Sequence, residues 1–255
     1  MTLVGFKSIS AILILAITLL SGLFTLQITN SRQRLMQLID ACANGIFIGA
    51  ALFHLLPDAS GGLKTLGYHH SYLFALAIGA IGFLFLNSLE KWSLGKTKQP
   101  FYRAARISTI ILLTILTIHA LLTGATLGIT NTLSASWVIL IAIAAHKGCE
   151  SFALISNMRK ASYQPLSLSL SLIAFAFVTP IGVLLGGLAN MSLPFYSSHV
   201  ASAYFSAFAA GTFIYLGTKH SLHTNHGCND SYSQWQQLLA SLSGVTAMGL
   251  IAVFA

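Results

Sequence analysis

Three ionisable side chains lie within five positions of one apolar stretch: His146, Lys147 and Glu150 in AAHKGCES, residues 144–151. Residues four positions apart share one face of a helix, so His146 and Glu150 present an imidazole and a carboxylate side by side. Lys147 is rotated by about 100° from His146 and is expected to point away from this pair. Nitrogen and oxygen ligands of this kind suit Zn²⁺, Fe²⁺ or Mn²⁺. The spacing therefore predicts two ligands of a divalent-metal site.

A third ligand is available on the preceding apolar run, where His119 lies in ILTIHALLTGATLG at a matching depth. Thr123 follows His119 by four positions and could add a weak oxygen ligand or orient a ligand, and Cys149 lies close to the predicted ligand face. We therefore predict a site formed by His119, His146 and Glu150. The alternative is a structural polar cluster, in which Lys147 and Glu150 neutralise each other and the histidines hydrogen-bond within a helix bundle.

A second group of polar residues occurs in GIFIGAALFHLLPDA, residues 45–59. His54 and Asp58 are four positions apart, and Pro57 lies between them. Proline removes a backbone donor, so the helix is expected to end or kink here. One interpretation is an entrance path where an incoming cation loses part of its water shell. The other is an ordinary helix end with a polar fringe.

A third group occurs in the segment KHSLHTNHGC. It places four soft or borderline metal ligands within nine residues, and such a composition is typical of metal-binding tracts. The segment is interpreted as a metal-acceptor loop, with a flexible polar link as the alternative. The residues concerned are His220, His223, His226 and Cys228.

The elements that must position these residues are membrane-spanning helices. The 255 residues are 55% hydrophobic and 7% charged, whereas soluble domains carry about 25% charged residues. We predict an all-α membrane protein with eight transmembrane helices in one domain, residues 1–255. A span needs about 20 apolar residues, and the predicted spans are 7–29, 38–57, 71–90, 105–127, 135–156, 167–189, 200–218 and 235–254.

The basic residues predict the orientation of these spans. Ten of the 13 Lys and Arg residues fall in the first, third, fifth and seventh links, and Lys64 alone falls in the others. The positive-inside rule then places both termini on the extracytoplasmic side. Because the net charge of +8 is concentrated in short links, it indicates membrane topology and not a nucleic-acid partner. The pairs Gly45/Gly49, Gly124/Gly128 and Gly182/Gly186 predict close packing between helices.

Taken together, the motifs resemble the ZIP (Zrt/Irt-like) family of divalent-metal transporters over essentially the full length of the chain. The segment ending in HLLPDA resembles the family's second span. HALLTGATLG resembles the fourth-span pattern H-S-x-x-x-G-x-x-x-G, and HKGCESFAL resembles the fifth-span pattern H-K-x-x-E-x-F-A-L. TPIGVLLG and GTFIYLGT resemble the sixth- and seventh-span signatures.

The resemblance implies eight spans with both termini outside the cytoplasm, and metal movement into the cytoplasm by alternating access. It implies that His119, His146 and Glu150 are transport-site ligands between the fourth and fifth spans, with His54 and Asp58 on the outer entrance path. Zn²⁺ is the first expected substrate, and Fe²⁺, Mn²⁺ and Cd²⁺ are further candidates. The expected protein is not an enzyme, has no prosthetic group, lies in the plasma or inner membrane among lipids, and could form a homodimer.

The chain departs from the family pattern at two positions of this site. Many relatives have Glu where this chain has Thr123, and Asn or Asp of a second metal site where it has Lys147. An ammonium has no lone pair for a metal and repels a second cation. The resemblance therefore predicts one transported ion, with Lys147 at the second-site position in place of another ion. A seventh-span acid of the family is also absent, and His220 falls near its expected position.

Two other functions are weighed against transport. An intramembrane zinc hydrolase needs a metal-bound water and usually a general base, but the H-E-x-x-H motif is missing because Lys147 follows His146. A membrane haem protein could use His119 and His146 as axial ligands, and a Soret band would reveal it. ATP hydrolysis is not expected, since the chain has no Walker A motif.

Overall fold

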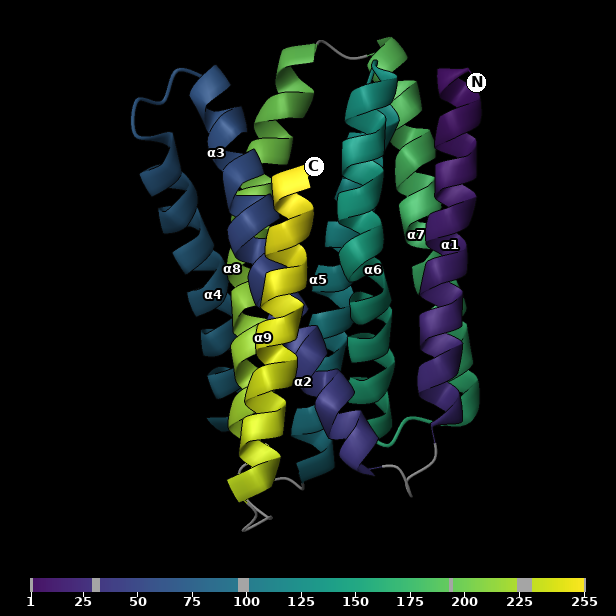
Figure 1. The fold of residues 1–255 in the computed structure, drawn as a ribbon, viewed down its shortest axis with the longest axis vertical. Coiled ribbons are helices and arrows are strands. Elements are labelled where there is room, and N and C mark those ends of the chain that lie inside the picture. The colour runs from purple at the N-terminus through teal and green to yellow at the C-terminus, as the bar shows by residue number, and fades with distance from the viewer. Residues whose placement is uncertain (1, 29–32, 96–100, 193–194, 224–230, 255) are drawn as a thin grey trace. The chain divides into compact units, whose positions relative to one another are not determined.

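The computed structural model describes residues 2–28, 33–95, 101–192, 195–223 and 231–254, in which every regular element is helical (Figure 1). Seven helical segments in these ranges are long and apolar enough to cross a membrane, and α8 is a further long helix beside them. The predicted all-α membrane fold is confirmed, while the side on which the termini lie stays a prediction. The helices are α1 Leu3–Gln27, α2 Gln33–Ala50, α3 Leu56–Thr65, α4 Ser71–Gly95, α5 Phe101–Ile129, α6 Leu133–Lys160, α7 Pro165–Ser192, α8 Phe195–His223 and α9 Ser231–Phe254.

The chain folds into two compact units. The first unit holds α1, α5, α6 and α7, and the second holds α2, α3, α9 and most of α4 and α8. The residues of each unit are discontinuous in the sequence, because the long segment 88–202 joins the N-terminal helix in the first unit. All three predicted transport-site ligands belong to the first unit, whereas His54 and Asp58 belong to the second.

Glycines bring α5 and α7 together within the first unit. A Cβ added to Gly124 would lie 3.1 Å from the Cα of Gly182 and would overlap the carbonyl oxygen of Thr179. One turn further along, a Cβ on Gly128 would lie 2.8 Å from the backbone nitrogen of Gly187. The predicted small-residue spacing therefore marks a backbone-to-backbone contact, which fixes α5 at a short distance from α7.

We expect Gly124→Val to destabilise the first unit by about 1–3 kcal/mol, because the new side chain must displace the backbone of α7. Thermal unfolding of the purified protein in detergent measures the change. Gly61→Ala is the matched control, since nothing lies within 4 Å of a Cβ at Gly61. Alanine in that helix should be neutral or stabilising by about 0.5–1 kcal/mol. Equal melting temperatures for Gly124→Val and wild type would contradict the close contact.

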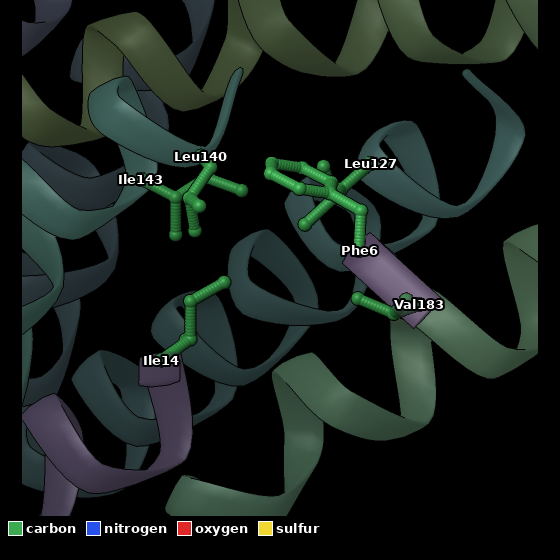
Figure 2. Packing of buried hydrophobic residues seen from close by; sticks show 6 residues of the cluster. All are labelled: Phe6, Ile14, Leu127, Leu140, Ile143 and Val183. Carbon is green, nitrogen blue, oxygen red and sulfur yellow. The ribbon is translucent and has the colours of Figure 1, made fainter. Parts of the chain in front are cut away.

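An apolar cluster joins all four helices of the first unit (Figure 2). Phe6 and Ile14 extend from α1 toward residues of the other three helices, and each is at most 2% exposed. The cluster closes the space between the helices by burying aliphatic and aromatic surface. Its other members are Leu127, Leu140, Ile143 and Val183.

The ends of α6 are set by local sequence. The side chain of Thr132 caps the helix by accepting from the backbone N–H of Ala135 at 3.4 Å. At the other end, Ser162 has a φ of 56°, and the N–H of Tyr163 donates to the carbonyl of Met158 at 3.2 Å. This is the Schellman arrangement, which satisfies helix-end carbonyls and reverses the chain.

Of the two outcomes expected at Pro57, an end or a kink of the helix, the end is wrong. A π-helical segment, Ala51–Leu55, follows α2 directly and leads into α3, so one candidate span runs from Leu35 to Thr65. The N–H of Leu56 donates to the carbonyl of Ala51, as a π-turn requires. Pro57 then falls in the first turn of α3, where a missing N–H costs little. The wider turn therefore absorbs the proline, and the helix continues.

Candidate metal centre

The three predicted ligands come together inside the first unit. His119 lies on α5, and His146 and Glu150 lie on α6. One ligand atom from each residue lies within 4.8 Å of those of the other two. The three residues are between 1% and 3% exposed, so this is a buried group of two imidazoles and one carboxylate.

Both imidazoles face the same oxygen of Glu150. The Nε2 atom of His119 lies 3.4 Å from Oε1 of Glu150, and the Nε2 atom of His146 lies 3.7 Å from it. The two imidazole rings are 5.8 Å apart between centroids and are inclined by 51°. A zinc ion binds such atoms at about 2.0–2.2 Å, and atoms with these separations can surround one ion after a small inward movement.

Glu150 Oε1 accepts no hydrogen bond from the residues that the structure describes. A buried carboxylate oxygen without such a bond is costly, because it has lost its water. A cation between Oε1 and the imidazole nitrogens would remove this cost. The donor set therefore fits a divalent metal ion better than a closed network of protein hydrogen bonds.

The expectation that Lys147 points away from the ligands is wrong. Its Nζ donates to Oε2 of Glu150 at 2.8 Å. Side chains three positions apart are neighbours on a helix surface, and the four-carbon stem of lysine spans the remaining offset. The ion pair considered as an alternative to the metal site is thus present, but it uses Oε2 and leaves Oε1 to the histidines.

Phe175 on α7 is a member of this centre that sequence reasoning missed. The Nζ of Lys147 lies 4.3 Å from the centroid of its ring, within the distance of a cation–π interaction. Phe175 is buried. It stands in the apolar run LIAFAFVTP, where nothing in the residue types distinguishes it from the exposed Phe177.

Thr123 and Cys149, the two other positions predicted near the buried group, have different surroundings. The hydroxyl of Thr123 donates to the carbonyl oxygen of His119 in its own helix, an arrangement in which it braces the backbone of a ligand. Cys149 is half-buried. Within the described residues, the potential metal-binding group comprises the two histidines and the glutamate, without Cys149.

Hydrogen bonds between α1 and α6 hold the turn of α6 that carries Glu150. Ser151 Oγ donates to the carbonyl of Thr18 at 2.7 Å, and Ser21 Oγ donates to the carbonyl of Gly148 at 2.6 Å. These bonds flank Glu150 in the sequence. They restrain the rotation of α6 about its axis and so keep the carboxylate directed toward His119.

The other two predicted groups lie elsewhere. In the second unit, His54 Nδ1 lies 3.1 Å from Asp58 Oδ2, and the Asp58 side chain is 56% exposed. The His54 side chain is half-buried, and the entrance path stays a prediction. Of the predicted acceptor loop, His220 and His223 belong to the last turns of α8, and their side chains lie outside the described residues, as do His226 and Cys228 altogether.

Helices that can span a membrane, together with a buried His/His/Glu group that could hold a metal ion, are typical of membrane proteins in which intramembrane ionisable residues mark an ion pathway. Sequence comparison gives the family: the profile described as "ZIP Zinc transporter" matches residues 94–252. The chain belongs to the ZIP zinc transporter family, whose members are transporters and not enzymes. It is therefore an integral multi-pass membrane protein, and its function is divalent metal transport.

Full-length relatives are found in distant organisms. The chain is 22% identical to zinc transporter ZIP2 of Mus musculus, with 99% of each chain covered. It is 26% identical to zinc transporter 11 of Arabidopsis thaliana, with 99% of this chain and 86% of the relative covered. It is 24% identical to zinc transporter ZIP9-B of Xenopus laevis, with 91% and 88% covered. The similarity thus extends well beyond the residues matched by the family profile.

Proposed function

We propose that this protein carries zinc across the membrane into the cytoplasm through a site formed by His119, His146 and Glu150. The observation that carries the proposal is the buried group itself, with Glu150 Oε1 facing two imidazole nitrogens and accepting no hydrogen bond from the described residues. The relatives named above as zinc transporters support zinc as the substrate. Fe²⁺, Mn²⁺ and Cd²⁺ are further candidates, because nitrogen and oxygen ligands accept all of these ions.

The proposed path begins at His54 and Asp58, where the cation exchanges part of its water shell for protein ligands. It continues to the buried group and ends near His220, His223, His226 and Cys228 on the cytoplasmic side. Access to the buried site alternates between the two sides of the membrane. A negative-inside potential of 100 mV favours inward movement of a double charge by about 4.6 kcal/mol, at about 2.3 kcal/mol per charge. The plasma or inner membrane is the proposed location.

Purified protein in liposomes tests this function. With a zinc-sensitive dye inside, zinc added outside should enter faster than into empty liposomes, and an inside-negative potential should increase the rate. Fe²⁺, Mn²⁺ and Cd²⁺ are compared in the same preparation. Rates equal to those of empty liposomes for all four ions would overturn transport, and faster flux of another ion than of zinc would overturn zinc as the first substrate.

We expect one metal ion in the transport core, because the ammonium of Lys147 already pairs with Oε2 of Glu150 and would repel a second cation there. Metal analysis of the purified protein gives the total number of ions, and the difference between wild type and His146→Ala/Glu150→Ala gives the number in the core. A difference of one ion agrees with this prediction. A difference of two would contradict it.

Acid on the outer side should slow zinc uptake. Histidine binds a metal only as the neutral imidazole, and protons compete for the same nitrogen. Because unperturbed histidine titrates near pH 6.5, initial rates should fall as the external pH drops well below 6. The rates are measured at constant membrane potential and constant free zinc. Unchanged initial rates at pH 5 would count against histidine ligation.

A further inference from the structure

The ammonium of Lys147 is held on two sides in the interior of the first unit. It donates to Oε2 of Glu150 at 2.8 Å and lies 4.3 Å from the ring centroid of Phe175. Lys147 and Glu150 are each 1% exposed, and Phe175 is equally buried. The contacts come from α6 and α7, so the position of the ammonium depends on how these two helices pack.

This arrangement determines the charge of the transport site before a metal arrives. With both imidazoles neutral, the group contains one carboxylate and one ammonium, and its net charge is zero. One of the two oxygens of Glu150 is already engaged by Lys147, which leaves Oε1 for the metal. Among the described residues, a divalent ion therefore enters a buried group with no net negative charge, in which an ammonium already pairs with the carboxylate of Glu150.

We infer that Lys147, positioned by Phe175, lowers the affinity of the transport site for divalent metal and thereby permits rapid release. This inference rests on the proposed transport role of His119, His146 and Glu150. Repulsion between the bound ion and the ammonium, or displacement of the ammonium from Glu150, opposes metal binding in either case. A conduction site must bind its ion well enough to admit it and weakly enough to let it leave. Lys147 is the affinity-setting residue, and Phe175 is a positioning residue that acts through it.

The first test replaces the ammonium by a neutral chain of similar length. Lys147→Met should lower the zinc Kd of the full-length protein at least tenfold, measured by competition with a fluorescent chelator. In liposomes, the same variant should show a lower KM together with a lower maximal rate, because release slows. Metal should also raise its melting temperature more than it raises that of wild type, since zinc then neutralises an otherwise unpaired buried carboxylate.

Two lysine variants serve as controls. Lys147→Arg restores the positive charge and should bring the Kd back toward the wild-type value. Lys7→Met removes another lysine of the same unit, whose Nζ donates to the carbonyl of Gly128 at 2.5 Å, and should leave the Kd unchanged. A Kd and KM for Lys147→Met within twofold of wild type would overturn the inference.

Variants of Phe175 provide a second test that keeps Lys147 in place. If Lys147→Met does not fold, these variants test whether Lys147 lowers the zinc affinity of the site. Phe175→Leu removes the aromatic ring and should lower the zinc Kd by about two- to fivefold, whereas Phe175→Tyr retains the ring and should shift it less. A weakened or unchanged affinity in Phe175→Leu would contradict the positioning role.

The variants distinguish an error in the ligand assignment from an error in the role of Lys147. If the ligand assignment is wrong, His146→Ala will bind and transport zinc as wild type does, whatever Lys147→Met shows. If the ligand assignment is right and the inference is wrong, His146→Ala will lose binding while Lys147→Met retains wild-type affinity.

Discussion

His146→Ala combined with Glu150→Ala should reduce zinc uptake into proteoliposomes to the rate of empty liposomes, a loss of at least about 100-fold. The double variant removes two of the three atoms that face one another in the buried group, and His119 alone cannot replace the water shell of a divalent ion. Loss of a partner outside the coordination shell already costs about 10–100-fold in metal affinity or activity, so loss of two ligands should cost more. Fe²⁺, Mn²⁺ and Cd²⁺ flux should fall with zinc flux.

His69→Ala is the matched histidine control, since His69 is exposed in the link between α3 and α4. It should transport zinc at the wild-type rate. The single variant His146→Ala is measured in parallel because it leaves the pair of Lys147 and Glu150 intact, so that a loss of flux is not due to an unpaired buried charge. Wild-type flux in the double variant would defeat the site assignment.

Breaking the pair of Lys147 and Glu150 on one side should be strongly destabilising. Glu150→Gln leaves a buried ammonium and Lys147→Met leaves a buried carboxylate, and each should lower the free energy of unfolding by about 3–5 kcal/mol. The combined variant removes both charges and should lose at least about 2 kcal/mol less than the sum of the single changes. Denaturant unfolding of metal-free protein in mixed micelles measures these differences.

The pair of His54 and Asp58 serves as the comparison for these single and combined variants of Lys147 and Glu150. Its atoms lie at a similar distance, 3.1 Å, but Asp58 is largely exposed. Exposed pairs contribute about 0–1 kcal/mol, so His54→Ala and Asp58→Asn should combine almost additively. Additive effects at Lys147 and Glu150 as well would show that their contact does not stabilise the metal-free protein.

Composition and periodicity by themselves predicted the helical membrane fold and the grouping of three buried polar residues. Long apolar runs of about 20 residues with few charges favour membrane-spanning helices, and every regular element in the residues that the structure describes is helical. The grouping of His119, His146 and Glu150 was also predictable from local rules. Helical geometry places His146 and Glu150 on one face, and the cost of polar groups in a bilayer favours their meeting His119 on the neighbouring span.

The tertiary structure decided the features that depend on packing between helices. Nothing in the local sequence shows that Pro57 follows a π-helical turn, because that turn is defined by a hydrogen bond from Leu56 to Ala51. On the helix, Lys147 is rotated by about 100° from His146, yet its side chain folds back so that its ammonium pairs with Oε2 of Glu150. Phe175 is one of many apolar residues until α7 packs beside α6 and its ring meets the ammonium. Sequence spacing thus predicted that His119, His146 and Glu150 could lie together. The packing of the helices decided that the ammonium of Lys147 lies beside them.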